Sequence, residues 1–338
     1  MSETRVGRLG IGRRTLVIAS LAVVWLAAGG ASQGADYVEQ INRGGIVNLP
    51  AGVIEISEPL KPGRGAGLVL RGQGPNKTIL KVTADMEALF TLEGKISEQG
   101  QIGNFHWWEI SNLTIDGDGH AADCLRLYVA VLGRMDRVEI KNFKGHAIHA
   151  RQWWDSMLSD VHFVRCGDAA TEKAAVVLDD PKLWKKANGE LCNPTAANCN
   201  NISFIGCRWE NCPFTMLQLN DYATKNRFVS CKWHGPLAPL NQEQVEPPAF
   251  DHVQLTGAYD NAFEACNFTN CGGSAIVLRK SNDNSFYGCH IGNSREYGIR
   301  VEGSRRPDEV GITWSSIGGK NRKGNIGVVD GLRDPSSR

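Results

Sequence analysis

A group of ionisable and hydrogen-bonding side chains falls at matching positions of three successive segments. These residues are His149, Arg151, Asp179, Asp180, Gln218, Asn220, Asp221 and Tyr222. His149 or Tyr222 could accept a proton as a general base. The planar guanidinium of Arg151 could bind a carboxylate through two hydrogen bonds. Such a set would suit removal of a proton beside a carboxyl group, because the negative charge that develops there needs a cation nearby.

Further carboxylates and aromatic rings accompany this group. Asp179, Asp180 and Asp221 offer the oxygen ligands that Ca²⁺ takes in proteins, so they are the expected ligands if a cation takes part. Trp153 and Trp154 lie on the adjoining turn, and their rings could stack on sugars. The alternative is an ordinary solvated surface, on which none of these side chains has a role.

The same residues belong to short segments in which apolar side chains alternate with others, and this period of two predicts β-strands. The pairs predicted to point inward are Leu125/Leu127, Ile148/Ala150, Val176/Leu178, Leu217/Leu219, Val253/Leu255, Ile276/Leu278 and Ile299/Val301. The residues between them, predicted to point outward, are Arg126, His149, Val177, Gln218, Gln254, Val277 and Arg300. Gln218, Asn220 and Arg279 on this outward face are expected to bind substrate.

The motif Phe-x-x-Cys recurs along the second half of the chain. Its cysteines are Cys166, Cys207, Cys231, Cys266 and Cys289, with successive spacings of 41, 24, 35 and 23 residues. A short repeat that insertions lengthen in places is typical of a solenoid. Each repeat holds short strands without a hairpin signal, so the sequence predicts parallel strands stacked about 4.8 Å apart.

Ten cysteines in an exported chain would ordinarily indicate a disulfide framework. The five repeated cysteines are instead expected to be free thiols, because stacked side chains point the same way and suit a disulfide dihedral poorly. Cys192 and Cys199 lie in a polar insertion, and a disulfide that closes this loop is expected. A metal site is the alternative there, although no histidine stands nearby.

The N-terminal region, residues 1–35, has the pattern of an export signal. Basic residues precede an apolar run from Thr15 to Ala28, and small residues follow, with expected cleavage after Ala31 or Ala35. The adjacent Arg13 and Arg14 hint at twin-arginine export, and the expected location is periplasmic or secreted. A membrane anchor is the alternative. A net charge of +1 gives no basic footprint for nucleic acid, and no membrane contact is expected after cleavage.

Three segments carry a resemblance to a known family. They run from Ile46 to Ile56, from Leu68 to Gly74, and from Asn112 to Gly117. They resemble the pectate-lyase superfamily, whose members are right-handed, single-stranded parallel β-helices. The repeats place an all-β solenoid over residues 46–317, which leaves a C-terminal tail over 318–338. The resemblance implies an N-terminal capping helix over 36–45, with Asp36 as its N-cap.

This fold hosts lyases, hydrolases, epimerases, esterases and adhesins, so the site has to decide the function. We expect an exported, monomeric protein that acts on an acidic polysaccharide. The expected reaction is α-proton abstraction, as in a lyase or a C5 epimerase, and Ca²⁺ is the cofactor that the carboxylates could bind. A polygalacturonase-type hydrolase is one alternative. Asp179-Asp180 fits it, but Gly145-His146-Ala147 lacks a second glycine and Arg279-Lys280 lacks a spacer. A non-catalytic carbohydrate-binding or surface-structural solenoid is the other.

Overall fold

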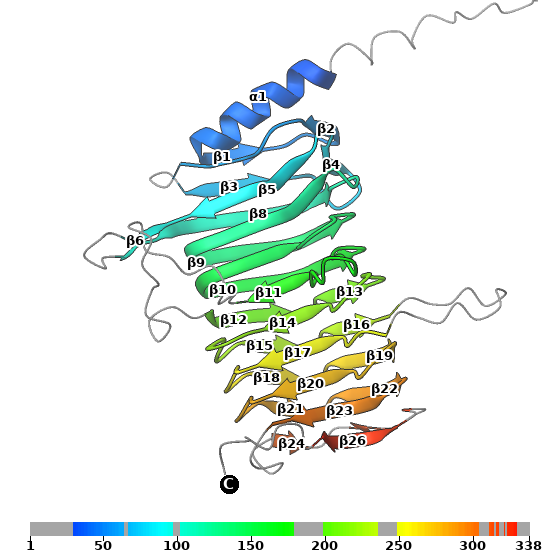
Figure 1. Ribbon diagram of the computed structural model, residues 1–338. Coiled ribbons are helices and arrows are strands. Elements are labelled where there is room, and N and C mark those ends of the chain that lie inside the picture. The colour runs from blue at the N-terminus through cyan, green and yellow to red at the C-terminus, as the bar shows by residue number, and fades with distance from the viewer. Residues whose placement is uncertain are drawn as a thin grey trace, which may run out of the picture.

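A computed structural model describes residues 30–63, 67–96, 102–178, 199–235, 249–303, 311–313, 316–317, 321 and 323–329. The chain winds into a tall stack of coils with one helix across its N-terminal end (Figure 1). All strand pairings are parallel within the main sheet, and the described residues add one small antiparallel pair, β6–β7. The all-β solenoid expected from the repeat is therefore confirmed.

The elements follow one another as short strands separated by turns. The N-terminal elements are α1 (Gly30–Arg43), β1 (Gly45–Asn48), β2 (Gly52–Ile56), β3 (Leu68–Arg71), β4 (Thr78–Val82), β5 (Met86–Glu93), β6 (Lys95–Ile96), β7 (Ile102–Gly103), β8 (Phe105–Asp116), β9 (Ala121–Lys141) and β10 (Ile148–Val164). Strands β8, β9 and β10 are long because each runs around a corner of the coil without losing its pairing to the next coil.

The later coils repeat a three-strand unit. Their strands are β11 (Val176–Leu178), β12 (Asn200–Ile205), β13 (Arg208–Glu210), β14 (Leu217–Leu219), β15 (Arg227–Val229), β16 (Lys232–His234), β17 (Val253–Thr256), β18 (Ala262–Glu264), β19 (Asn267–Cys271), β20 (Ile276–Arg279), β21 (Ser285–Tyr287), β22 (His290–Ser294), β23 (Tyr297–Glu302), β24 (Gly311–Thr313), β25 (Ser316–Ile317) and β26 (Gly324–Val329). Each strand pairs with its counterpart in the neighbouring coil, so three parallel faces run the length of the stack.

One of these faces, which we call the groove face, carries the outward row expected from the sequence. It consists of β5, the first residues of β9 and β10, then β11, β14, β17, β20, β23 and β26. Its register pairs Arg126 with His149, His149 with Val177, Val177 with Gln218, and Gln218 with Gln254. The predicted register along this row is confirmed, including its continuation through Val277 and Arg300.

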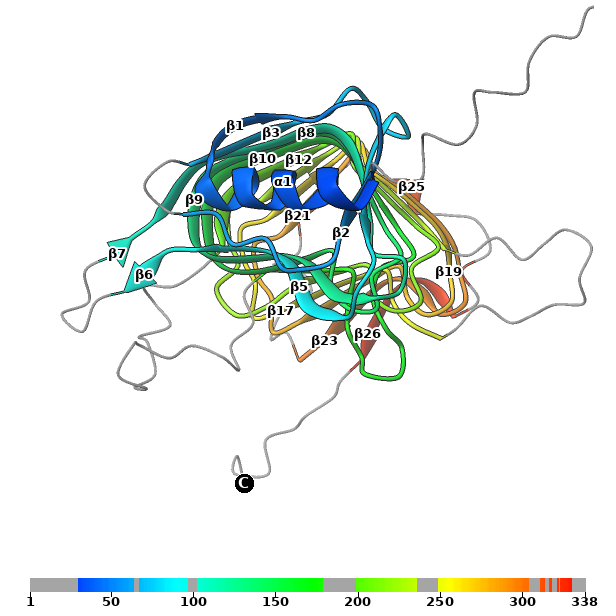
Figure 2. The same ribbon diagram turned by 90° about the horizontal axis from the view of Figure 1, so that it is seen from above.

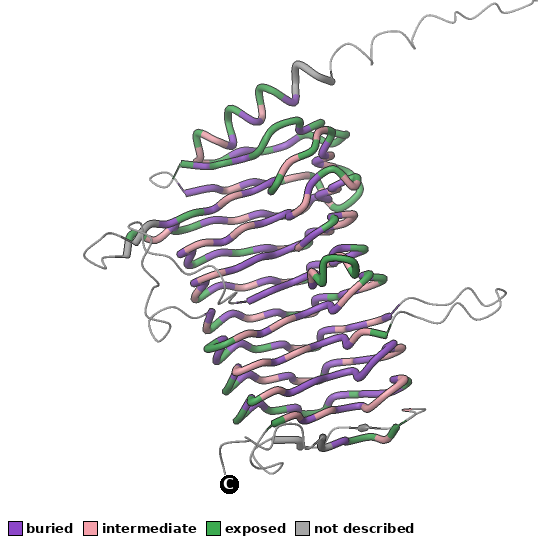
Figure 3. The backbone as a smooth tube through the Cα atoms, viewed as in Figure 1, coloured by how far each residue is buried: buried purple, intermediate pink, exposed green. Residues whose placement is uncertain are grey.

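Like side chains stack inside the coils. Phe204, Phe228 and Phe263 form one stack, with ring centroids 4.7 and 4.6 Å apart. Trp209 and Trp233 stack beside it, 4.7 Å apart. These contacts repeat at the strand spacing because each coil presents the same position to the next. Figure 3 shows buried residues recurring along the strands of every coil, in many strands in alternation with less buried ones.

Polar ladders accompany the aromatic stacks. The side-chain amide of Asn226 donates to Asn261 at 3.0 Å, and that of Asn261 donates to Asn284 at 3.0 Å. The repeated cysteines lie in the core, where for example the thiols of Cys231 and Cys266 donate to backbone carbonyls of the preceding coil. No disulfide joins the described cysteines to one another. The side-chain amides at the turns and the thiols in the core thus donate hydrogen bonds to oxygen atoms that the stacked coils bury.

The N-terminal cap differs from the sequence expectation. Helix α1 begins at Gly30, so Asp36 lies within the helix and is not its N-cap, and a cut after Ala35 would fall inside it. The helix lies across the open end of the first coil (Figure 2). Val38 and Ile41 are buried against that end. Gly34 passes so close to the backbone carbonyl of Glu55 that a Cβ would collide there, which explains a glycine inside the helix.

The C-terminal boundary also differs. The solenoid was expected to end near Ile317, but β26 pairs in parallel with β23 and extends the stack to Val329. Glycine-rich sequence at Gly324 and Gly327 hid this strand from the alternation pattern, because glycine marks neither an inward nor an outward position. Among the described residues, no helix has the length and apolar character needed to cross a membrane.

Candidate functional site

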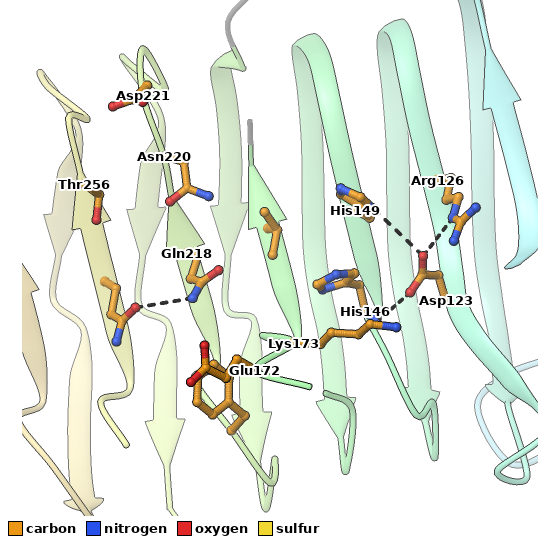
Figure 4. A pocket seen from close by; sticks show the side chains of 13 residues that line it. Asp123, Arg126, His146, His149, Glu172, Lys173, Gln218, Asn220, Asp221 and Thr256 are labelled. Carbon is orange, nitrogen blue, oxygen red and sulfur yellow. Dashed lines mark hydrogen bonds and ion pairs between the residues drawn. The ribbon is translucent and has the colours of Figure 1, made fainter. Parts of the chain in front are cut away.

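A groove of about 680 Å³ runs along the groove face across five coils (Figure 4). The residues that line it are Asp123, Arg126, His146, His149, Glu172, Lys173, Val177, Phe214, Gln218, Asn220, Asp221, Gln254 and Thr256. Ionisable side chains gather at the end formed by β9 and β10, which we call the charged half. Amide and hydroxyl side chains gather at the end formed by β14 and β17, which we call the amide half.

Asp123 organises the charged half from a buried position just before the inward pair of β9. Its Oδ1 accepts the backbone N–H of His146, one coil further on, at 3.0 Å, and its Oδ2 accepts Nε–H of Arg126 at 2.7 Å. His149 Nδ1 lies 3.9 Å from the same Oδ2. Burial would raise the pKa of Asp123, but His149, the charge and backbone N–H of His146, and Arg126 hold it well below its usual range. Asp123 is therefore a permanent anion.

His146 faces this anion as a neutral imidazole. Its Nδ1 lies 2.6 Å from the carbonyl oxygen of Ala174. Because a carbonyl only accepts, Nδ1 carries the proton and Nε2 carries the lone pair. Burial lowers the pKa of His146 to about 4, although the Asp123 charge acts in the opposite direction. At neutral pH the half-buried ring is thus in its basic form and held in one tautomer.

His149 and Arg126 complete this part of the wall. The rings of His146 and His149 have centroids 4.8 Å apart, and His149 is 6% exposed. Arg126 donates both to Asp123 and, through its NH1, to Glu87 at 2.6 Å. Two carboxylates therefore already occupy the Arg126 guanidinium.

A short hairpin supplies the other cation of the charged half. Asp168 and Lys173 exchange two backbone hydrogen bonds of 2.9 and 2.8 Å, and the Asp168 carboxylate accepts the backbone N–H of Ala170 and the hydroxyl of Thr171. These bonds fix the hairpin between β10 and β11. It carries Glu172 and Lys173 to the groove, where Lys173 reaches towards His146 (Figure 4).

The amide half has a different chemistry. The side-chain amide of Gln218 donates to Gln254 at 3.3 Å, and Gln254 donates in turn to Asp251 at 3.0 Å. Asn220, Asp221 and Thr256 line the groove beside them. Such groups suit hydrogen bonds to sugar hydroxyls, because amides both donate and accept.

The structure brings together several residues that the sequence singled out. His149, Gln218, Asn220 and Asp221 all line the groove. Arg151 lies two residues after His149 on β10 and pairs with Tyr128, and its guanidinium carbon lies 4.7 Å above the ring centroid of Tyr128. Arg151 is not among the residues that line the groove.

Other expected site residues lie elsewhere. Tyr222 is exposed on the turn after Asp221 and does not line the groove. Arg279 donates to Glu302 at 2.6 Å, and this ion pair occupies it. Trp154 is half-buried on the adjoining stretch of β10 and does not line the groove either.

The expectation that Trp153 stacks on sugar is wrong. Trp153 is fully buried, its indole N–H donates to Ser156 at 2.7 Å, and its ring packs near Trp108. The reason is a corner in the chain. Gln152 has a φ of 52°, which bends the strand and turns the next side chain inward. Phe214, which lines the groove, is the aromatic ring that a sugar could contact there.

Three predicted residues, Asp179, Asp180 and Cys192, lie outside the described residues. The cation site at Asp179, Asp180 and Asp221 therefore stays a prediction. Within the described ranges, no three His, Cys, Asp or Glu side chains gather in a way that would hold a metal ion. Cys199 is buried in the core, with its sulfur 3.7 Å from the carbonyl oxygen of Ala150. Its disulfide to Cys192 also stays a prediction.

Sequence reasoning missed Asp123, His146 and Lys173 as a set, although an internal repeat marks the first of them. Asp251 repeats the geometry of Asp123. Its Oδ1 accepts the backbone N–H of Ser274, one coil on, at 2.8 Å, and Gln254 takes the place of Arg126. In both cases a glycine precedes the donor, Gly145 or Gly273, and a Cβ on it would collide with the carboxylate. We call this contact a coil staple.

Comparison with known proteins agrees with the architecture. The sequence profile of the family described as "Right handed beta helix region" matches residues 195–311. A capsule-specific depolymerase, Depolymerase 1 of Klebsiella phage KN3-1, is 26% identical over 155 residues, which are 46% of this chain and 17% of that protein. The chain thus matches only a small part of that relative's length.

Solved structures show the same fold. The ORF18 protein of Geobacillus virus E2 aligns with a TM-score of 0.63 and 18% identity, over 85% of this chain and 54% of that one. An alginate lyase from Paenibacillus sp. str. FPU-7 aligns with a TM-score of 0.55 and 12% identity, over 87% of this chain and 94% of that one. At these identities the likeness is one of fold. The chain has the right-handed parallel β-helix fold.

Proposed function

We propose that this chain binds an acidic polysaccharide along the groove face and removes the α-proton of a uronate residue at the charged half, as a lyase or a C5 epimerase. The observation that carries the proposal is His146. Its ring is neutral, Ala174 fixes its tautomer so that Nε2 holds the lone pair, and the Asp123 carboxylate, which binds the His146 backbone, is ionised. A general base must be unprotonated before it can accept a proton, and His146 is in that form at neutral pH.

Asp123 supports this base in two ways. It holds the backbone of His146 through the coil staple, and its negative charge stabilises the imidazolium that forms when His146 takes a proton. His149 lies 3.9 Å from Asp123 through its Nδ1, and its ring centroid is 4.8 Å from that of His146, so it is a second titratable imidazole beside the same anion. Asp123 therefore acts as a positioning residue, and His146 is the base.

Lys173 supplies the positive charge. Removal of the proton at C5 leaves an electron pair that delocalises into the uronate carboxylate, and a cation beside that carboxylate stabilises it. Arg126 is engaged by Asp123 and Glu87, whereas Lys173 lines the groove next to His146. In a lyase the electron pair then expels the oxygen at C4, which receives a proton. In an epimerase a proton returns to the opposite face of C5.

Hydrolysis finds less support in the described residues. A glycosidase needs a protonated carboxyl group as its acid. Asp123 cannot serve, because its partners keep it ionised. The remaining carboxylates of the groove, Glu172 and Asp221, are exposed and come from the hairpin before β11 and the turn after β14.

The test is product analysis on uronate-containing polysaccharides. Unsaturated products that absorb in the ultraviolet identify a lyase. Deuterium taken up at C5 from heavy water, without cleavage, identifies an epimerase. New reducing ends without ultraviolet absorbance would replace this proposal with a hydrolase, and binding without any product would replace it with a carbohydrate-binding solenoid.

Variants then assign the base. His146→Gln should lower turnover by about a hundredfold or more and leave binding nearly unchanged. His290→Gln is the matched control, because His290 is exposed on β22 and does not line the groove. Full activity of the His146→Gln protein would overturn the assignment of the base.

A further inference from the structure

The layout of charge in the groove points to a substrate class. We infer that the substrate is a heteropolysaccharide in which acidic sugars are separated by neutral ones, and not a homopolymer of uronates. The inference rests on the proposed function, because it takes the charged half as the place where the uronate binds. It goes further by assigning the neighbouring sugars from the amide half.

In the part of the groove that the structure describes, the cations lie at one end. Among the described lining residues the fixed cations are Arg126 and Lys173, both in the charged half. Two carboxylates already bind Arg126, and Glu172, which precedes Lys173 on the hairpin, adds another carboxylate to the groove. Lys173 is therefore the one cation among these lining residues that an incoming negative charge can meet. The charged half therefore accommodates a single uronate carboxylate.

The described side chains of the amide half offer no positive charge to a bound carboxylate. Gln218, Asn220, Gln254 and Thr256 are uncharged, and Asp221 adds an exposed carboxylate. The nearest arginines further along the stack are occupied: Arg279 binds Glu302, and Arg300 binds Glu296 and Glu302. A carboxylate placed over this half would meet Asp221, and none of the described lining residues of this half supplies a compensating cation.

Along the described residues, the length of the groove exposes a homopolymer to this mismatch at more than one unit. From β9 to β17 the pairing advances by four strand steps, β9–β10–β11–β14–β17. At about 4.8 Å a step this is about 19 Å, enough for about four sugar units. A polyuronate carries a carboxylate on each unit, so it would set several of them over the amide half. Neutral sugars would instead present hydroxyls to the glutamines.

Binding and turnover should be measured on two groups of polymers. The homopolymers are polygalacturonate and polymannuronate. The heteropolymers, including gellan and xanthan, carry one glucuronate per repeat among neutral sugars. Affinity electrophoresis measures binding, and ultraviolet absorbance with deuterium uptake measures turnover. We expect a member of the second group to bind on the order of tenfold or more tightly than either homopolymer.

The outcomes separate the two proposals. Preference for a heteropolymer with turnover supports both. Preference for a heteropolymer without turnover supports the substrate class and overturns the proposed function. Turnover of a homopolymer at equal or higher efficiency supports the proposed function and overturns the substrate class. Absence of binding to every polymer overturns both.

A charge variant tests the cause directly. Asp221→Lys should strengthen binding of polygalacturonate by about tenfold at low salt, and added salt should abolish the gain. Asp221→Asn should give a smaller gain. Glu58→Lys makes the same charge change at an exposed site that does not line the groove. An equal gain in the Glu58→Lys control would show that net charge alone is responsible, which would overturn the argument from Asp221.

Discussion

His252 should make the folded state sensitive to acid. It is 3% exposed, directly precedes β17, and lies near His234 and the backbone carbonyl of Asn270. Burial lowers the pKa of its imidazole from 6.5 to about 3, and the His234 charge acts in the same direction. In the unfolded chain the same ring titrates near 6.5.

The sign and size of the effect follow from this difference. Because the folded pKa lies below the unfolded one, the unfolded chain binds the proton first. The stability that depends on a neutral His252 is complete above about pH 6.5, and it is lost as the pH falls towards 3. Between pH 7 and pH 5, His252 should cost about 2 kcal/mol of unfolding free energy, and His146 should add about the same. Asp251, whose pKa burial raises, acts in the opposite direction.

Urea unfolding at pH 7 and pH 5 measures the difference, followed by circular dichroism. In a His252→Leu variant the loss between the two pH values should be smaller by about 2 kcal/mol, whatever the stability of that variant at pH 7. If this substitution prevents folding, an NMR titration of the wild-type ring should find it neutral at pH 5. A ring that titrates near pH 6.5 in the folded protein would refute the reasoning.

Four further outcomes are expected. The acidic limb of kcat/KM should lie near pH 4, where His146 becomes protonated, and a limb near 6.5 would contradict its assignment as the buried base. Lys173→Ala should lower kcat/KM by about tenfold or more in steady-state assays, whereas Lys61→Ala, an exposed lysine away from the groove, should not. Trp153→Ala should lower the free energy of unfolding in denaturant by about 3–5 kcal/mol, whereas Trp153→Phe should leave polysaccharide affinity unchanged. A loss of affinity in the Trp153→Phe protein would show that this ring contacts the polysaccharide. Asn261→Ala should cost about 1–3 kcal/mol, because it leaves ladder partners unsatisfied, and an unchanged unfolding midpoint would argue against the ladder.

The fold was predictable because its signals are local and repeated. Alternation within short strands set which residues point inward, and the recurrence of Phe-x-x-Cys set the period. Register followed from these two, which is why the row from Arg126 through His149 to Gln254 was predicted correctly. The alternation of inward and outward residues fails where the chain turns a corner of the coil. At Gln152 a positive φ reverses the alternation, so Trp153 turned inward against expectation.

The charged half was harder to predict because its parts meet only through stacking. Asp123 and His146 are 23 residues apart, and each precedes the inward pair from which the alternation of its coil was assigned. Lys173 comes from a hairpin whose position depends on the hydrogen bonds of Asp168. A search for aspartates that precede the inward pair, with a glycine one coil later, would have found Asp123 and Asp251 together.

The coil staples bear on how such a groove can change its specificity. At Asp123 and at Asp251 a carboxylate of one coil fixes the backbone of the next, so neighbouring coils are locked in phase at both ends of the groove. Duplication or loss of a coil between the two staples would leave each end intact. Such an event would lengthen or shorten the distance between the charged half and the amide half by one strand step, about 4.8 Å. The groove would then fit a substrate with a different spacing between the acidic sugar and its neutral neighbours, without any substitution at the residues that contact them.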